Sequence, residues 1–548
     1  MKKIIFFNIF LALTFLFSTS CDEELNLAPK SDISDPTYWK NANDFKLAAN
    51  YFYSYLVGYT FDDNNSDIAF DLSPTQLSNG TAVAPASSYV NWDLQYNVIR
   101  NCNKLLEMGE KYANKDEIKI YVGEAKFFRA LNYFHLFRQY GGVPLVKTVL
   151  DVNSPDLFGE RATRDATIDF ILQDLDEAIA VLPLKGASES GRATKGAALT
   201  LKARASLFEG TWRKFHNTGD ANAMLDKAIA ASGEVIASGK YSLHPDYRRL
   251  FIMAGDNSAE VIFDIRRKVG VWEHDFSSWV GSGRYNPTRK LAEMYLSIDG
   301  LPISKSPIYQ GEATFTSEYQ SRDGRMVQTM ITPGIKILRP MEPSGNNEQW
   351  PAKGNNRNVM SGYMIYKFLE ENPAGLSWST ADFDWHYLRY GEVLLIYAEA
   401  IFERNGNISD TDLNKSINEL RKRAGFPPTA YLTNDFVTAN GLDMRTEIRR
   451  ERTVELAFEG FRRDDLNRWK TAETELPKAV RSVKVIGTQW ETYTLFEFVV
   501  KNNLYDADGY IVLEKAENRT FDPAKHYLMP LPTKQVALNP KLAQNPKW

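Results

Sequence analysis

Apolar stripes with helical spacing, which carry small residues on the same faces, constrain the fold of this chain more than any other feature. Four segments show the pattern most clearly: residues 167–182, 197–208, 225–236 and 387–401. In each of them apolar side chains recur every three or four positions, as on one face of a helix. Pro183, Gly239 and the pair Asn405-Gly406 follow three of these segments and are typical helix ends. Each segment is therefore predicted to form a helix.

Small residues on these stripes, among them Ala197, Ala205, Gly391 and Ala398, allow neighbouring helix backbones to approach closely. Helix pairs with such contacts resemble tetratricopeptide repeats, although the chain shows no clean period of about 34 residues. We therefore predict a mainly α fold, in which stacked tetratricopeptide-like helix pairs form a rigid scaffold.

Between residues 240 and 385 the helical pattern stops, and glycine, proline, asparagine and serine become frequent. Residues 261–265 have the pattern of a short strand, and five of the 11 tryptophans fall in this quarter of the chain. Loops on a rigid scaffold commonly form binding surfaces. We therefore predict that residues 240–385 are an irregular, loop-rich ligand-binding region. Residues 471–525 form a second irregular stretch with short strand-like pieces.

The N-terminus has the order of residues found in a secretory signal. Lys2 and Lys3 precede an apolar run over residues 4–17, and residues 18–20 are small and polar. A membrane-spanning helix needs about 20 apolar residues, and this run is shorter. Residues 1–20 are therefore predicted to be a signal peptide.

Cys21 directly follows the small residues, and this arrangement resembles a bacterial lipoprotein signal. In such signals the cysteine becomes the new N-terminus and carries acyl chains such as palmitate, and several chains anchor a protein stably. Cys21 is therefore predicted to be the lipid anchor. A polar tether over residues 21–37 and a single body over residues 38–548 would follow it. Cys102 then has no disulfide partner.

The charge balance gives no indication of a nucleic-acid partner. Residues 1–20 contain two lysines and no acidic residue, so their removal changes the formal net charge from −4 to −6. The chain contains no basic run, and nucleic-acid-binding domains are usually strongly basic.

No catalytic or metal-binding motif is present in the sequence. There is no His-Glu-x-x-His, no Cys-x-x-Cys and no phosphate-binding glycine loop with its lysine. The six histidines are scattered, and His274, which lies among charged residues, is interpreted as solvated. A glycosidase needs only two suitably placed carboxylates, so the 69 acidic residues leave a glycoside hydrolase open as an alternative. No cofactor and no metal are expected.

Several sequence blocks, in a fixed order, carry a family resemblance. They are residues 124–130 (EAKFFRA), 140–145 (YGGVPL), 387–395 (YLRYGEVLL), 417–425 (INELRKRAG), 448–452 (IRRER), 455–460 (ELAFEG), 465–469 (DLNRW), 527–532 (YLMPLP) and 538–546 (LNPKLAQNP). With the lipoprotein signal, these blocks resemble the SusD/RagB family of outer-membrane nutrient-binding lipoproteins. Gly391 stands where alanine is commoner, and Asp464-Asp465 where an aromatic-Asp pair is commoner. Both departures are expected to affect packing only.

The resemblance implies an α-rich body that sits as a lid on a TonB-dependent outer-membrane transporter. It implies a non-enzymatic protein that captures oligosaccharides, or in one branch peptides, and delivers them to that transporter. The acidic residues after Cys21 resemble a signal for export to the cell surface, so the lipid-anchored body is expected to face the cell exterior.

Charged residues recur inside the otherwise apolar blocks: Glu124, Arg129, Arg389, Glu392, Glu399, Arg421, Glu455 and Arg462. Charges are tolerated in a protein interior when they are paired. We therefore interpret them as ion pairs that tie the scaffold together, and not as ligand-binding groups. Trp92 and Trp469 lie in helix-like segments and are interpreted as core residues.

The ligand site is predicted from the chemistry of sugars. An aromatic ring covers the apolar face of a sugar ring, while polar side chains hydrogen-bond to its hydroxyl groups. The candidate ligand-binding residues are Trp272, Asp275, Trp279, Arg284, Tyr285 and Trp350. Aromatic loops also bind peptides, so a peptide remains the second ligand class.

Overall fold

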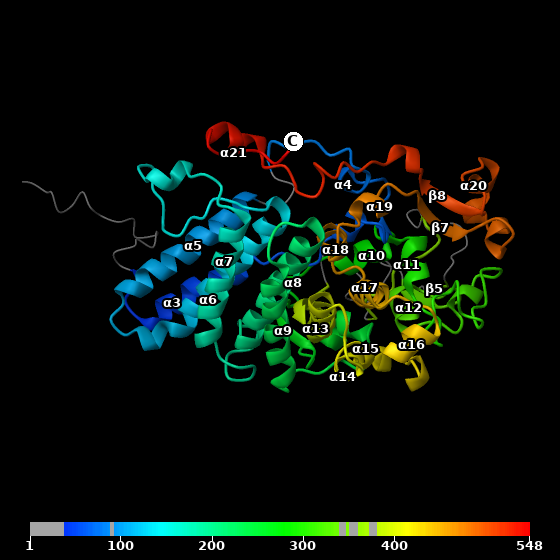
Figure 1. Cartoon of the computed structure of the whole chain (residues 1–548), viewed down its shortest axis with the longest axis horizontal. Coiled ribbons are helices and arrows are strands. Elements are labelled where there is room, and N and C mark those ends of the chain that lie inside the picture. The colour runs from blue at the N-terminus through cyan, green and yellow to red at the C-terminus, as the bar shows by residue number, and fades with distance from the viewer. Residues whose placement is uncertain (1–37, 88–91, 339–346, 350–359, 372–380) are drawn as a thin grey trace, which may run out of the picture.

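Figure 1 shows the computed structural model of the chain, which describes residues 38–87, 92–338, 347–349, 360–371 and 381–548. The predicted signal peptide, Cys21, the tether and Trp350 lie outside the described residues. In the part that is described, no helix is both long enough and apolar enough to cross a membrane.

Long helices form an array along one side of the molecule. They are α3 (Ala42–Tyr53), α5 (Trp92–Lys111), α6 (Lys115–Tyr140), α7 (Arg164–Val181), α8 (Lys195–His216), α9 (Ala221–Ala237), α13 (Tyr390–Asn405) and α17 (Met444–Glu455). From α5 to α9 each helix packs on the next one in the chain, and α13 packs on α9. The array occupies the left and centre of Figure 1, so the predicted helix-pair scaffold is confirmed.

The four predicted helices are present as α7, α8, α9 and α13. The start of the fourth was predicted too early, because Tyr387 lies in a strand and α13 begins at Tyr390. Gly406 ends α13 with a φ of 75°, a left-handed conformation that glycine adopts without strain.

Glycines on the helix faces allow the close contacts that the sequence predicts. A Cβ atom added to Gly210 of α8 would lie 2.9 Å from Leu225 Cγ of α9. One added to Gly123 of α6 would lie 2.6 Å from Val181 Cγ2 of α7. Both distances are shorter than a normal carbon contact, so these helix pairs pack at a spacing that only glycine permits.

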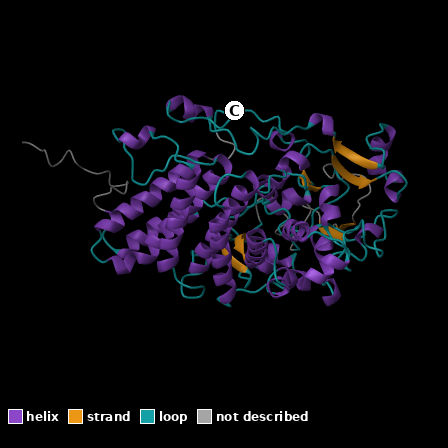
Figure 2. Cartoon of the chain, viewed as in Figure 1, coloured by secondary structure: helices purple, strands orange, loops and turns teal. Residues whose placement is uncertain are grey.

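The rest of the described chain consists of short elements. The short helices are α4 (Gln76–Asn79), α10 (Phe276–Gly281), α11 (Arg289–Met294), α12 (Gly324–Thr329), α14 (Asp410–Asn414), α15 (Ile417–Arg423), α16 (Asn434–Ala439), α18 (Arg462–Arg468), α19 (Ala472–Glu475), α20 (Glu497–Lys501) and α21 (Thr533–Leu538). The strands are β1 (Ala69–Phe70), β2 (Val261–Ile265), β3 (Asn286–Pro287), β4 (Lys336–Leu338), β5 (Asn347–Gln349), β6 (Trp385–Arg389), β7 (Val480–Lys484) and β8 (Tyr510–Glu514). Figure 2 shows these few strands as short pairs among and beside the helices.

Antiparallel strand pairs join distant parts of the chain. Strand β2, predicted from residues 261–265, pairs with β6, so that Ile265 lies opposite Trp385 and Val261 opposite Arg389. This ladder brings together the two ends of the loop-rich region. Strand β1 pairs with β3, and β7 pairs with β8 within the second irregular stretch.

The charged residues of the family blocks form ion pairs, as predicted. Glu455 of α17 pairs with Arg389, Arg423 and Arg325. Glu399 of α13 pairs with Arg468. The other pairs are Glu124–Arg192, Arg129–Asp174, Glu392–Arg204, Arg421–Glu451 and Arg462–Asp67. Trp92 and Trp469 are buried, as expected for core residues.

Candidate functional site

Three of the predicted ligand-binding residues lie together around the short helix α10. Trp279 Nε1 donates a hydrogen bond of 2.5 Å to Asp275 Oδ2, four residues earlier. The Arg284 guanidinium carbon lies 5.0 Å from the centroid of the Trp279 ring. Trp279 is half-buried, and the side chain of Arg284 is 39% exposed. The structure therefore presents one indole beside a carboxylate and a guanidinium, which is the combination predicted for a sugar site.

Asp71 belongs to the same group of residues, and the sequence analysis did not select it. Arg284 Nε lies 3.6 Å from Asp71 Oδ1. The two residues come together because β1 pairs with β3, which places Phe70 opposite Asn286. No local pattern marks Asp71, since its neighbour Arg284 lies in a distant part of the chain. We call Asp71, Asp275, Trp279 and Arg284 the α10 surface.

Trp272 lies near the tip of a tight turn and stacks on an arginine. The turn is closed by the pairing of Lys268 with Trp272. The Arg267 guanidinium carbon lies 3.8 Å from the Trp272 ring centroid and 4.1 Å from the Trp385 ring centroid. The three side chains thus form a stack, and Trp272 is its exposed end, with 39% of its surface accessible. Burial between two indoles lowers the pKa of Arg267 to about 10, so the guanidinium stays charged at neutral pH.

His274 is buried, and the interpretation of this histidine as solvated is wrong. Its ring lies 4.4 Å from the Phe383 ring and 4.8 Å from the Trp385 ring. Burial lowers its pKa to about 4, so the imidazole is neutral at physiological pH. His274 therefore links the Trp272 turn and α10 to the core beneath them.

Tyr285 is placed in the core and not on the surface. It is 1% exposed, and its hydroxyl accepts a hydrogen bond from the Asp63 N–H at 3.2 Å. Its ring packs edge-on against Phe61 and Phe458. In this arrangement a ligand has no access to the Tyr285 ring, and Trp350 lies outside the described residues.

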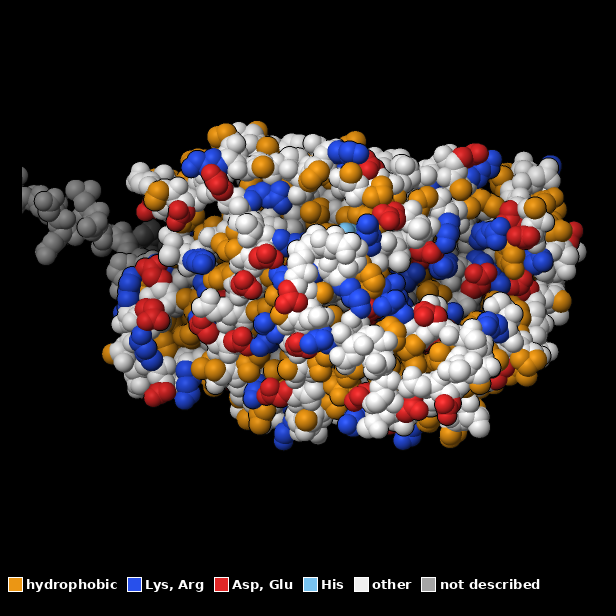
Figure 3. All heavy atoms as spheres, in the orientation of Figure 1, with side chains coloured by type: hydrophobic (Ala, Val, Ile, Leu, Met, Phe, Trp, Pro, Cys, Tyr) orange, Lys and Arg blue, Asp and Glu red, His pale blue; other side chains and the backbone are white. Residues whose placement is uncertain are grey.

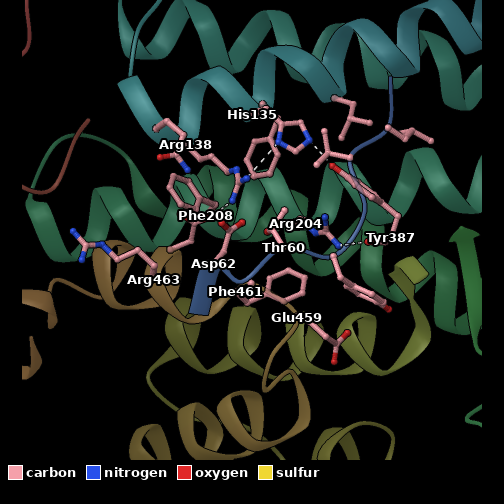
Figure 4. A pocket seen from close by; sticks show the side chains of 18 of the residues that line it. Thr60, Asp62, His135, Arg138, Arg204, Phe208, Tyr387, Glu459, Phe461 and Arg463 are labelled. Carbon is pink, nitrogen blue, oxygen red and sulfur yellow. Dashed lines mark hydrogen bonds and ion pairs between the residues drawn. The ribbon is translucent and has the colours of Figure 1, made fainter. Parts of the chain in front are cut away.

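An interior pocket of about 320 Å³ lies between the helix array and the chain around α18 (Figure 4). In it, Tyr387 hydrogen-bonds to His135, and Arg204 pairs with Glu392 at 2.6 Å. Burial, together with the nearby Arg138 and Arg204, holds the pKa of His135 well below its usual range. His135, Arg204 and Tyr387 thus have partners within the protein, and the pocket lies where the scaffold meets the rest of the chain.

Among the residues that the structure describes, there is no group of three or more His, Cys, Asp or Glu side chains placed to hold an ion.

The fold defines a class of protein: a stack of helix pairs that carries a loop-rich region on one flank. The chain belongs to the SusD family, whose model matches residues 255–548. A second family model, described as "Starch-binding associating with outer membrane", matches residues 44–207. Together these matches reach from the first long helix to the C-terminus.

Relatives match most of the chain. The SusD-like protein P38 of Formosa agariphila is 25% identical over 513 residues, which cover 86% of this chain and 93% of that protein. A SusD-like protein of Bacteroides ovatus is 23% identical over 566 residues, which cover 97% of this chain and 96% of that protein.

Solved structures share the fold at low sequence identity. A SusD-like carbohydrate-binding protein from Bacteroides fragilis superposes with a TM-score of 0.74 at 22% identity, covering 92% of this chain and 100% of that one. A laminarin-binding SusD-like protein gives a TM-score of 0.59 at 19% identity, covering 93% of this chain and 100% of that one. The predicted mainly α, tetratricopeptide-like fold is thereby confirmed.

Proposed function

We propose that this protein captures oligosaccharides at the cell surface and delivers them to a partner TonB-dependent outer-membrane transporter. The observation that carries the proposal is the α10 surface, together with the exposed Trp272 on the turn that precedes α10 in the chain. The polar groups are the carboxylates of Asp71 and Asp275 and the guanidinium groups of Arg267 and Arg284. They accompany the indoles of Trp272 and Trp279. The match to a family model described by starch binding and the outer membrane supports the same function.

The geometry suits a sugar ring physically. The outer face of Trp272 is open, while Arg267 fixes its inner face, so little side-chain freedom would be lost when a sugar stacks on it. Trp279 is fixed in a similar way by its hydrogen bond to Asp275. Asp71, Asp275 and Arg284 supply acceptors and donors for hydroxyl groups. We infer binding without chemistry from the likeness to SusD-like carbohydrate-binding proteins, and the product analysis below tests it, because the site also contains two carboxylates.

Calorimetric titration of the full chain against plant, microbial and host oligosaccharides, with mixed peptides alongside, tests this function. Trp279→Ala and Trp272→Ala are each expected to weaken binding of the preferred glycan by about tenfold. Phe158→Ala is the matched control, because Phe158 is also an exposed aromatic residue but lies far from α10 in the sequence. Unchanged affinity in both tryptophan variants would exclude this site.

The same titrations separate the alternatives. Heat with peptides alone would place the protein in the peptide-binding branch. Shortened glycans in the reaction mixture, detected by chromatography, would identify a glycoside hydrolase and overturn the proposal of a non-enzymatic protein.

The lipid anchor and the partner have tests of their own. Cys21→Ala is expected to release the protein from the outer-membrane fraction, since acylation at that sulfur is the proposed anchor. Protease added to intact cells is expected to digest the native protein, because the body is proposed to face the exterior. Co-purification of a TonB-dependent transporter with the detergent-solubilised protein would identify the partner.

A further inference from the structure

A concave surface separate from the α10 surface is lined by other residues of the loop-rich region and by α17. It is an open groove of about 870 Å³ bounded by α11, α17, the loop of residues 302–313 and the ends of β7 and β8. None of the residues of the α10 surface lines it. In Figure 3 the basic side chains gather on this face, over the part of the molecule that holds α11 and α17. We call it the α17 groove.

The lining of the α17 groove is rich in cations. Its basic residues are Arg289, Lys290, Arg449, Arg450, Arg462 and Lys484, and its acidic residues are Glu293, Glu312 and Glu475. Most of the cations have a carboxylate partner; Lys290, for example, lies 2.9 Å from Glu475. The charge that a ligand would find therefore depends on the cations whose pairing is weak or absent.

Arg449, on α17, is one of these cations. Its nearest carboxylate is Glu403, at 3.9 Å from Nη2. Glu403 already pairs more closely with Arg445, at 2.8 Å, and with Lys214, at 2.7 Å. Neither Nε nor Nη2 of Arg449 has a hydrogen-bond partner among the described residues. These two atoms are buried, and the Arg449 side chain is 17% exposed, so an anion in the groove would meet the small accessible part of an arginine whose charge is only weakly paired.

The position of Arg449 is fixed by stacking. Its guanidinium carbon lies 4.7 Å from the ring centroids of both Phe215 and Trp469. Trp469 also lines the groove. Arg449 is therefore held in place before any ligand arrives, which lowers the entropy cost of binding.

Lys484, at the end of β7, is the second such cation. It lines the groove, and within the described ranges it takes part in no ion pair. Its ammonium nitrogen lies 5.6 Å from the ring centroid of Tyr510. Tyr510 is itself fixed, because its hydroxyl donates to Glu312 Oε2 at 2.9 Å. The guanidinium groups of Arg289 and Arg481 also lie over this ring, at 4.9 and 5.5 Å. Several cations are therefore gathered here around one phenol ring, which suits a carboxylate or sulfate group of a ligand.

We propose that the α17 groove binds an anionic oligosaccharide, with Arg449 and Lys484 pairing with its carboxylate or sulfate groups. The inference rests on the proposed function for the class of polymer and adds the charge of the ligand. An extended peptide fits less well, since β7 is paired with β8 and its Val483 N–H also donates to Ser361 O. That strand therefore offers little free edge for main-chain hydrogen bonds.

The test is calorimetric titration of the full chain in mild detergent with four probes. These are an oligogalacturonate, a sulfated galactan oligosaccharide, a neutral laminari-oligosaccharide and a short polyglutamate peptide. An anionic sugar is expected to bind about tenfold more tightly than the neutral one. The preference is expected to shrink as NaCl rises from about 0.05 to about 0.5 M, because salt screens exposed charges. The carboxylate and sulfate arms show which anion is preferred.

Two variants assign the preference to the groove. Arg449→Gln and Lys484→Gln are each expected to weaken binding of the anionic sugar about tenfold and to leave the affinity for the neutral sugar unchanged. Lys484 is half-buried at the rim, so its variant reports on the groove even if Arg449→Gln fails to fold. Lys227→Gln on α9 is the control, since Lys227 is exposed, undergoes the same charge change and does not line the groove.

The outcomes distinguish this inference from the function on which it rests. Equal affinity for neutral and anionic sugars, or unchanged affinity in the Lys484 variant, would overturn the anionic groove alone. Binding of the peptide without any sugar would also overturn it and favour the peptide branch. If no oligosaccharide binds at all, both the proposed function and the proposed anionic-sugar site in the groove are contradicted.

Discussion

The helix array from α5 to α9 and the rest of the molecule, here called the loop-rich half, both contain buried ion pairs, such as Arg129–Asp174 between α6 and α7, but they rely on them to different degrees. The array from α5 to α9 encloses apolar side chains such as Phe127, Leu175 and Leu201, which are fully buried. The loop-rich half also has an apolar cluster, but charged side chains join it to the scaffold. Arg325, Arg389 and Arg421 are all fully buried there and pair with carboxylates.

The difference shows how irregular chain can be held as firmly as helices. Apolar packing has no direction and suits repeated, regular faces. Short loops have few such faces, and each buried arginine can instead bind several loop and helix segments in a fixed geometry. Helix α17 supplies Glu451 and Glu455 for this purpose. We infer that α17 is the element that fixes the loop-rich half to the scaffold.

The largest effect is expected from Glu455→Gln, which breaks the buried network at its centre. Glu455 pairs with three arginines, so its loss leaves buried cations with too few partners. The free energy of unfolding should fall by about 3–5 kcal/mol. Denaturant titration followed by circular dichroism measures this loss.

The control for this change is Glu107→Gln, which removes an exposed pair with Lys111 on α5. Its cost should be about 0.5 kcal/mol or less. If Glu455→Gln cost no more than Glu107→Gln, the ion pairs would not be what holds the loop-rich half.

Buried ion pairs and apolar packing should also respond differently to acid. Arg468, with Arg452 and Trp469, lowers the pKa of the buried Glu399 to about 2, against about 4.5 when unfolded. A depressed pKa contributes stability that is complete above the unfolded pKa and is lost as pH falls from about 4.5 to about 2. The contribution at neutral pH is about 3 kcal/mol.

Glu399→Gln should therefore be clearly less stable than the native chain at pH 7 and close to it at low pH. Leu201→Ala in the array should cost about 2–5 kcal/mol at both pH values, since a cavity does not titrate. Unfolding curves at the two pH values give both differences. If the free energies of unfolding of Glu399→Gln and the native chain differed by the same amount at both pH values, the role assigned to this carboxylate would be contradicted.

A smaller effect is expected at Gly391, where the sequence departs from the family pattern. A Cβ atom there would lie 2.3 Å from Arg389 Nη1 and 3.0 Å from Glu455 Oε1. Gly391→Ala should therefore destabilise by about 1–3 kcal/mol, although alanine usually stabilises a helix. Gly233→Ala on α9 is the matched control, because its Cβ would meet only Tyr397 at 3.6 Å. Thermal unfolding measures both melting temperatures. If Gly233→Ala lowered the melting temperature more than Gly391→Ala did, the side chains of the buried ion-pair network would be able to move aside at little cost.

The smallest effect on stability is expected at the exposed end of the Trp272 stack. Trp272→Ala removes one cation–π contact at the surface, so it should cost about 1 kcal/mol or less. The same variant is expected to lose glycan affinity. A large drop in melting temperature would mean that Trp272 belongs to the structural core.

The sequence predicted the regular part of this fold well. Helices such as α7 and α9 have long apolar stripes and clear end signals, and both are local properties. The strand ladders could be predicted only as isolated pieces, since β2 and β6 are paired by contacts between segments far apart in the chain. The start of α13 was misplaced because the β6 residues before it are also apolar.

The candidate site was predictable only in part, for a similar reason. Asp275, Trp279 and Arg284 lie close in sequence, which is why the sequence could predict that their side chains lie close together. Tyr285 follows Arg284 directly and points to the opposite side of the chain, into the core. Arg267 and Asp71 depend on Trp385 and on the β1–β3 pair, which no local pattern reveals.

The β2–β6 ladder has a consequence for how such proteins diversify. It fixes both ends of residues 266–384 on the scaffold, so that the chain between them is a closed insert. Doubling the length of a flexible closed segment costs only about 0.6 kcal/mol of chain entropy. Surface loops within this insert can therefore change in length, and with them what the protein recognises, while the β1–β3 pair and the buried contacts of Arg325 keep the rest of the insert joined to the scaffold.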